Sequence, residues 1–66
     1  MKVKVQITDN YSGRSTCIIT NIEKPGLVNW GYINAGISDW QRKKIEACFD
    51  RKNLHLNITP KIIKIY

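Results

Sequence analysis

The first eight residues alternate between apolar and polar side chains without a break, in the order Met-Lys-Val-Lys-Val-Gln-Ile-Thr. Successive side chains of a β-strand point to opposite faces, so this run predicts a strand with one buried face and one solvated face. A strand of this kind belongs in a sheet that is covered on one side only. The solvated side would display Lys2, Lys4, Gln6 and Thr8.

A second strand is expected over residues 15–22, which are rich in β-branched side chains. Residues 9–14 separate this segment from the first strand. They contain Asp, Asn, Ser and Gly, which are the residue types that form turns. We therefore predict a β-hairpin whose loop is longer than a tight turn.

Residues 27–36 admit two interpretations. Val28, Trp30 and Tyr32 alternate as they would in a short third strand. The two glycines and two asparagines of the same stretch are typical of an irregular loop instead. A turn at Pro25 and Gly26 precedes the stretch in either case. The sequence leaves the two interpretations open.

The clearest local signal is a capping box, in which Ser38 is followed three residues later by Gln41. It predicts a helix over residues 39–52, with Asn53 just beyond its end. The side chains that share the buried face of this helix are Gln41, Ile45, Cys48 and Phe49. Most of its charged residues lie on the opposite face, toward water.

Residues 54–59 alternate again, with Leu54, Leu56 and Ile58 on the buried side. Pro60 interrupts this pattern, because proline has no N–H to donate to a sheet. Residues 62–66 then form either a last short strand or a continuation of the preceding strand across a β-bulge. If these strands pair beside residues 1–8, His55, Asn57, Lys64 and Tyr66 would join Lys2 and Lys4 on the solvated face.

These elements fit into a single domain that spans residues 1–66. The predicted order is strand, strand, an optional third strand, helix, strand and an optional last strand. A single helix can cover one face of a sheet of roughly three to five mainly antiparallel strands. The predicted fold class is therefore a two-layer α+β domain.

Eleven Lys and Arg stand against five Asp and Glu, which gives a net charge of +6. The basic residues are interleaved with apolar ones, so a folded chain would display them on its faces. A cationic surface raises the local concentration of polyanions. We therefore predict a non-enzymatic module that binds the phosphate backbone of DNA or RNA. The expected phosphate contacts are Lys2, Lys4, Arg14, Arg42, Lys43 and Lys44, and the expected aromatic contacts are Tyr11, Trp30 and Tyr32.

A protein-interaction module is the alternative prediction. Trp30 and Tyr32 lie in a Gly-rich segment, where Trp30 is expected to cap one end of the core. If the two are instead exposed on a loop, they would anchor a protein interface, because aromatic residues dominate binding hot spots. A homodimer would instead form through an open sheet edge. Ile, Lys and Asn are abundant and have A/T-rich codons, which suggests a small accessory protein of a phage or plasmid.

The residues that enzymes and metal sites need are sparse in this chain. His55 is the single histidine and has no carboxylate close to it in sequence, so we expect no general base. Cys17 and Cys48 form no zinc-binding spacing and are expected to be thiols packed in the core. We predict no catalytic residue, no metal, no cofactor and no small-molecule substrate.

Membrane and export signals are not expected either. No apolar run reaches the roughly 20 residues of a membrane span. Lys2 and Lys4 alternate with apolar residues, and no continuous apolar segment of a signal peptide follows them. The predicted location is the cytoplasm, without membrane contact.

Overall fold

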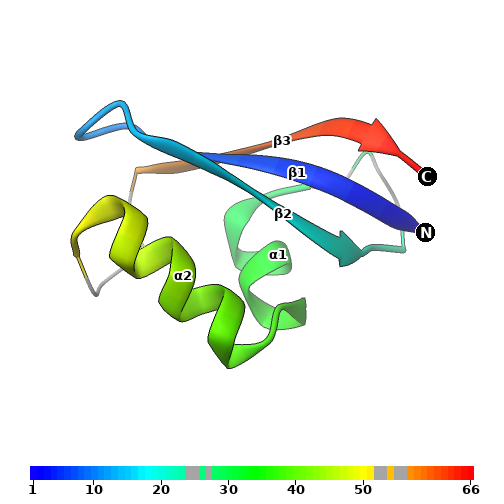
Figure 1. The fold of residues 1–66 in the computed structure, drawn as a ribbon. Coiled ribbons are helices and arrows are strands. Elements are labelled where there is room, and N and C mark those ends of the chain that lie inside the picture. The colour runs from blue at the N-terminus through cyan, green and yellow to red at the C-terminus, as the bar shows by residue number, and fades with distance from the viewer. Residues whose placement is uncertain (24–25, 27, 52–53, 55–56) are drawn as a thin grey trace.

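The computed structural model describes residues 1–23, 26, 28–51, 54 and 57–66. Its elements follow the order β1 (Lys2–Asp9), β2 (Ser15–Asn21), α1 (Trp30–Gly36), α2 (Asp39–Phe49) and β3 (Ile58–Ile65). The strands form one antiparallel sheet in the order β2-β1-β3. Both helices lie on the same side of this sheet, and no described element covers its other side (Figure 1). The α+β class is confirmed, but two helices replace the predicted single helix.

The predicted hairpin between β1 and β2 is confirmed. Its loop is closed by a hydrogen bond of 2.8 Å from the Asp9 N–H to the Arg14 carbonyl oxygen. Gly13 has a φ of 77°, a left-handed conformation that glycine adopts without steric cost. The loop is also tied to the start of β3, because the Asn10 N–H donates to the Asn57 carbonyl oxygen at 2.8 Å.

Helix α1 replaces both predictions for residues 27–36 within the described part of that segment. Asn29 is its N-cap, and the Asn29 side-chain oxygen accepts a hydrogen bond of 2.9 Å from the Tyr32 N–H. Trp30 and Ile33 are both buried. Residues three apart lie on the same face of a helix, so these two side chains can pack into the core together. The alternation that suggested a strand has no structural counterpart.

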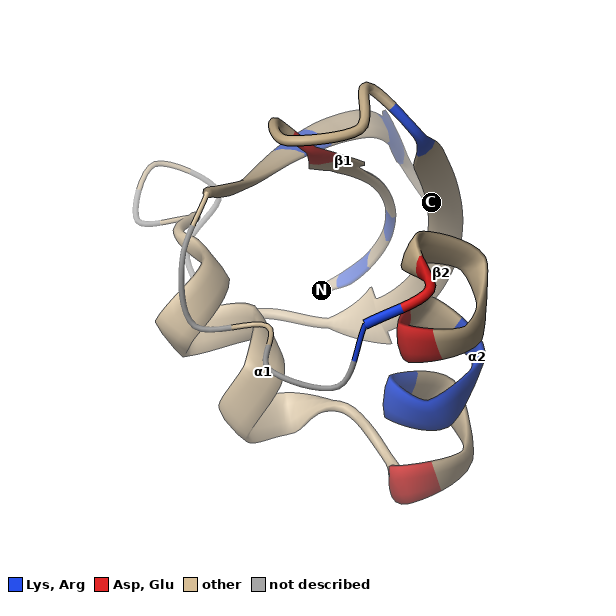
Figure 2. Cartoon of the chain, turned by 90° about the vertical axis from the view of Figure 1, so that its left-hand side faces the viewer, with Lys and Arg blue, Asp and Glu red and all other residues tan. Residues whose placement is uncertain are grey.

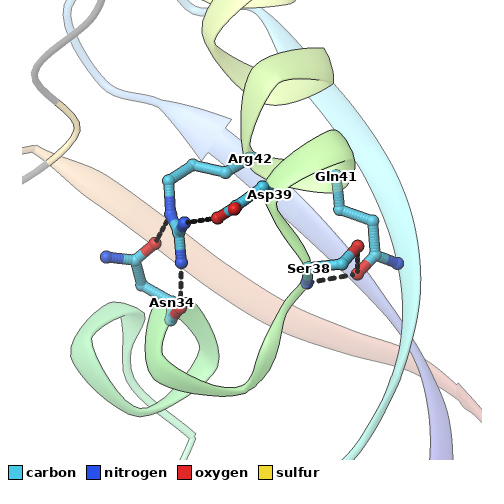
Figure 3. A network of polar contacts seen from close by, with 5 residues as sticks. All are labelled: Asn34, Ser38, Asp39, Gln41 and Arg42. Carbon is cyan, nitrogen blue, oxygen red and sulfur yellow. Dashed lines mark hydrogen bonds and ion pairs between the residues drawn. The ribbon is translucent and has the colours of Figure 1, made fainter.

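Helix α2 begins where the capping box predicted. The N–H and the hydroxyl of Ser38 both donate to Gln41 Oε1, at 3.1 and 3.2 Å (Figure 3). The helix ends earlier than predicted, because Asp50 takes a left-handed φ of 55° at its C-cap. The predicted stop at Asn53 lies outside the described residues.

Strand β3 is one continuous strand that includes Pro60. Proline is tolerated there because β3 lies at an edge of the sheet. The pairing register shifts between Lys4 and Val5 of β1, because β3 has one additional residue at this point, Ile63, which forms a β-bulge. The strand predicted over residues 54–59 is wrong in its extent, since β3 starts at Ile58. Residues 55–56 of that prediction lie outside the described residues.

The hydrophobic core lies between the sheet and the two helices. Val3, Val5 and Ile7 are fully buried on the inner face of β1, as the alternation predicted. The other buried apolar residues are Ile18, Ile22, Trp30, Ile33, Ile37, Ile45, Phe49 and Leu54. Both cysteines are free and half-buried. Cys48 packs against the core as predicted, whereas Cys17 lies opposite Gln6 on the other face of the sheet, so the predicted core position is wrong for Cys17.

Candidate nucleic-acid interface

The side of the sheet that faces away from the helices is called the outer face here. In an antiparallel sheet, residues directly opposite each other point to the same face. Lys4 lies opposite Lys64 of β3, and Gln6 lies opposite Lys61. Thr8 lies opposite Thr59 at the other end of the sheet. The pairing thus adds basic residues from β3 to the solvated side that the first eight residues predicted.

Tyr66 joins two of these lysines at the end of the sheet. Its N–H donates to the Lys2 carbonyl oxygen at 2.9 Å, which continues the pairing with β1 by one residue. The Lys2 Nζ lies 5.4 Å from the centre of the Tyr66 ring, and the Lys64 Nζ lies 4.8 Å from it. These distances are within the range of cation–π attraction. The aromatic ring therefore gathers two ammonium groups at one corner of the outer face.

No Asp or Glu side chain lies on the described outer face. The positions that the register places there are Lys2, Lys4, Gln6, Thr8, Ser15, Cys17, Ile19, Asn21, Thr59, Lys61, Lys64 and Tyr66. The acidic residues visible in Figure 2 lie instead along α2 and at one end of β1. Like charges directly across a strand pair are destabilising. Repulsion between Lys4 and Lys64 therefore lowers the stability of the sheet, and no described acidic side chain on that face offsets it.

A groove of about 470 Å³ continues the outer face past β2 toward α2. Lys4 lines this groove together with Ile19, Trp40 and Lys44. Gln41 also lines it, and its Nε2 donates to the Ile19 carbonyl oxygen at 3.1 Å. Lys44 is therefore the one predicted helix cation that the groove brings close to the outer face.

The guanidinium of Arg42 is used within the fold. Its Nε and one terminal nitrogen donate to the side-chain and backbone oxygens of Asn34, both at 2.8 Å, and its other terminal nitrogen donates to Asp39 at 2.8 Å (Figure 3). These bonds join the end of α1 to the start of α2. A phosphate contact by Arg42 would require some of them to break, so the predicted binding role does not fit its surroundings.

Substitution of Arg42 by alanine is expected to lower the free energy of unfolding by about 1–2 kcal/mol, because hydrogen bonds to a charged group are lost and the exposed ion pair with Asp39 adds little. Affinity for nucleic acid should stay within about twofold of the original under the same conditions. Urea unfolding and an oligonucleotide titration measure the two quantities. A tenfold loss of affinity in a folded variant would restore Arg42 to the interface.

Arg14 and Lys43 lie away from the outer face. The terminal nitrogen of Arg14 donates to the Cys48 carbonyl oxygen at 3.3 Å, beside the C-terminal end of α2. Lys43 lies on α2, and a surface depression groups it with Glu46 and Asp50. Neighbouring carboxylates offset the attraction of a lysine for phosphate. The structure therefore does not gather these two cations with Lys2 and Lys4.

The three predicted aromatic contacts are dispersed as well. Trp30 is only 8% exposed, so it packs in the core as expected and its ring is not available as a nucleic-acid contact in this fold. Tyr32 is half-buried, and its hydroxyl accepts a hydrogen bond of 2.9 Å from the Glu23 N–H. Tyr11 is exposed on the hairpin loop, with the guanidinium carbon of Arg51 5.2 Å from its ring centre. None of the three lies on the outer face.

Asp9 is the buried carboxylate of the described chain, with 1% of its surface exposed. Burial opposes its ionisation. Hydrogen bonds from Arg51, the Tyr11 N–H and the Ser12 hydroxyl outweigh that effect and hold the pKa of Asp9 below its usual value of 3.8. The charged form therefore fastens the hairpin loop to the segment after α2, and it points away from the outer face.

Lys61, Lys64, Tyr66 and Trp40 are not among the predicted contacts, although Lys64 and Tyr66 were expected on the solvated face if the last strands paired beside residues 1–8. The first three come from the last strand, about 60 residues away from Lys2 and Lys4 in sequence. The alternation of polar and apolar residues around Lys64 and Tyr66 was a signal that these side chains share one face. The β-bulge at Ile63 reverses the alternation, so Lys61 could not be assigned to the same face from sequence. Trp40 gave no signal, because it flanks the predicted apolar stripe of the helix.

Among the described residues, no group of three or more His, Cys, Asp or Glu side chains is arranged to hold a metal ion. His55 lies outside the described residues. Neither described helix has the length and apolar character needed to cross a bilayer.

Comparisons with known proteins give no further guide to the function. No protein-family model matches the chain, and no curated protein or solved structure matches it at a significant level. The geometry of the outer face is therefore the basis for a functional interpretation.

Proposed function

We propose that this protein is a non-enzymatic module that binds the phosphate backbone of nucleic acid through the outer face of its sheet. One observation carries the proposal. The register places Lys2, Lys4, Lys61 and Lys64 on one face, and no Asp or Glu side chain shares that face among the described residues. The proposal keeps Lys2, Lys4 and Lys44 from the sequence prediction and adds Lys61, Lys64 and Tyr66.

The physical basis is the release of counterions. Each lysine that neutralises a phosphate displaces a condensed cation from the nucleic acid, which favours binding in dilute salt. The lysines are attached to paired strands, so little backbone order has to be created on binding. Contacts to phosphate carry no direct sequence information. We therefore propose binding with weak sequence preference, in which Tyr66 adds an aromatic surface.

The affinity is expected to fall steeply with salt. With about four phosphates neutralised, the log–log slope of the association constant against salt should be about −3 for a single strand. Fluorescence anisotropy of labelled DNA and RNA oligonucleotides between roughly 50 and 200 mM salt measures this slope. The absence of a complex at micromolar protein and low salt, or an affinity independent of salt, would refute the proposal.

A second candidate is self-association through the free edge of β3. The observation that favours it is the exposure of Ile63 and Ile65 on this edge strand. Lys61 and Lys64 oppose it, because lysines on an edge strand disfavour pairing with another chain. Light scattering decides between the two, since a dimer mass that persists in high salt would indicate apolar edge pairing.

The compartment and the source remain proposals from the sequence. Composition suggests a cytoplasmic protein of a phage or plasmid, and a nucleic-acid partner is compatible with both. Recovery of the protein from its host with and without nuclease treatment would test the partner class in the relevant cell. Loss of the partner after nuclease treatment is the expected result.

A further inference from the structure

The groove between β2 and α2 has an apolar wall that phosphate contacts do not explain. Trp40 lines it and is 67% exposed, although it lies on a helix that packs against the core. Ile19, on the outer face of β2, is another exposed large apolar residue of the same lining. An exposed apolar surface with polar residues around it is typical of a binding site.

The groove is held open by bonds within the fold. The Gln41 amide nitrogen donates to the Ile19 carbonyl oxygen, while the Gln41 amide oxygen accepts from Ser38 at the helix start. Gln41 thereby connects the first turn of α2 to the edge of β2. Near the other end of the helix, the Cys48 thiol donates to the Ser15 carbonyl oxygen at 3.8 Å. The walls are consequently formed before any ligand binds, as in most ligand sites.

The charge of the groove has one sign. Lys4 and Lys44 contribute two ammonium groups to the lining, and none of the described residues that line it is acidic. Lys4 also lies opposite Lys64 on the outer face. The groove is therefore a continuation of the proposed phosphate-binding surface, with an aromatic residue added at its far side. A ligand with both phosphates and a flat apolar group matches this combination.

We propose that the groove receives an unpaired base of a single-stranded nucleic acid, with Trp40 stacked on the base and Lys4 and Lys44 on the adjoining phosphates. This inference rests on the proposed function and names its substrate class. Bases in a duplex are already stacked on each other, so their faces are not available to Trp40. The protein should therefore prefer single strands to duplexes, as binders that combine aromatic stacking with cationic grooves do.

The experiment follows tryptophan fluorescence of the full chain during titration at low salt. The probes are oligothymidine, a duplex of equal length, an abasic oligomer of equal length and polyglutamate. Oligothymidine should quench the emission and protect it from acrylamide, a neutral quencher that leaves the salt concentration unchanged, since Trp40 becomes covered. Trp30 is buried, so most of this change should disappear in Trp40→Phe.

Replacement of the aromatic ring separates stacking from charge. Trp40→Ala should bind oligothymidine roughly tenfold more weakly, because base stacking is lost. Its affinity for the duplex and for the abasic oligomer should not change, because both retain the phosphates. Thermal melting should show a folded variant, since Trp40 is exposed in the structure. The acrylamide measurement needs no variant and remains decisive if Trp40→Ala does not fold.

The outcomes distinguish this inference from the proposed function. If all three nucleic-acid probes bind with a salt dependence but oligothymidine leaves Trp40 open to acrylamide, the groove does not hold a base and the proposed function stands. If Trp40→Ala and the original chain bind oligothymidine equally well, the groove likewise does not hold a base, and the proposed function stands. If no nucleic-acid probe binds, both proposals fail. If polyglutamate protects Trp40 as strongly as oligothymidine does, the inference is overturned, and the groove binds an acidic protein segment instead of a base.

Discussion

A chain with Lys64→Glu is expected to bind single-stranded nucleic acid roughly 20-fold more weakly at low salt. One phosphate contact, worth nearly a factor of ten at about 50 mM salt, is lost, and the new carboxylate repels the backbone. Lys64 lies opposite Lys4 and beside Tyr66, so this reversal occurs within the lysine cluster of the outer face. Anisotropy titrations at several salt concentrations should also give a slope smaller by about 0.7.

The fold should tolerate this reversal. Lys64→Glu replaces a like-charged pair across the strands with an opposite-charged pair, which favours folding by about 0.2–1 kcal/mol. It also removes one cation–π contact with Tyr66, which is worth about 0.5–1 kcal/mol at an exposed site. The free energy of unfolding should therefore stay within about 1 kcal/mol of the original. Loss of binding could then not be attributed to unfolding.

Lys43→Glu is the matched control. Both variants have the same net charge, since each changes +6 to +4 by replacing one positive with one negative residue. Lys43 is exposed on α2 near Glu46 and Asp50, away from the outer face. Its reversal should weaken binding by no more than about threefold through the total field of the protein. Equal losses in the two variants would show that net charge matters and the outer face does not.

Asp9→Asn is expected to lower the urea midpoint of unfolding markedly at neutral pH. The carboxylate accepts bonds from Arg51, Tyr11 and Ser12 in a site with 1% of its surface exposed. The amide keeps one oxygen but replaces the other acceptor with a donor and leaves Arg51 facing a neutral group. The hairpin loop would then be less firmly held to the segment that follows α2. Urea titrations monitored by circular dichroism measure the change.

The stabilisation of the fold by the Asp9 carboxylate should depend on pH. The folded pKa of Asp9 lies below 3.8, so its ionisation stabilises the fold above the unfolded pKa and this contribution is lost as pH falls through the folded value. The difference between the original chain and Asp9→Asn should therefore be largest at neutral pH and shrink below about pH 4. Asp39→Asn is the control, because the Asp39 side chain is 90% exposed. A difference that stays constant down to strongly acidic pH would contradict the assignment.

Local signals predicted a large part of this fold. The alternation over the first eight residues identified β1 and its two faces, and the capping box identified the start of α2. Turn residues identified the hairpin. Each of these signals depends only on a few neighbouring residues, so it does not change with the packing of the rest of the chain. The extent of β2 and the buried positions of β1 followed from the same kind of evidence.

Helix α1 and strand β3 were not predictable in the same way. The seven residues of α1 are too few for a helical period to stand out, and Trp30 and Tyr32 share an alternation that also suits a strand. The course of β3 depends on the bulge at Ile63 and on its pairing with β1. Packing against the core and pairing between distant segments outweigh local preference at such places.

The amino-acid order thus established a basic α+β chain with Lys2 and Lys4 on the wet side of a strand, because side-chain alternation along a strand is a local property of the backbone. Which cations stand beside them was settled by strand order and register. Pairing with β3 placed Lys61 and Lys64 there, while hydrogen bonds to Asn34 and Asp39 engaged Arg42 in the fold. Neighbours across a sheet come from distant parts of the chain, so their positions arise only when the whole domain packs.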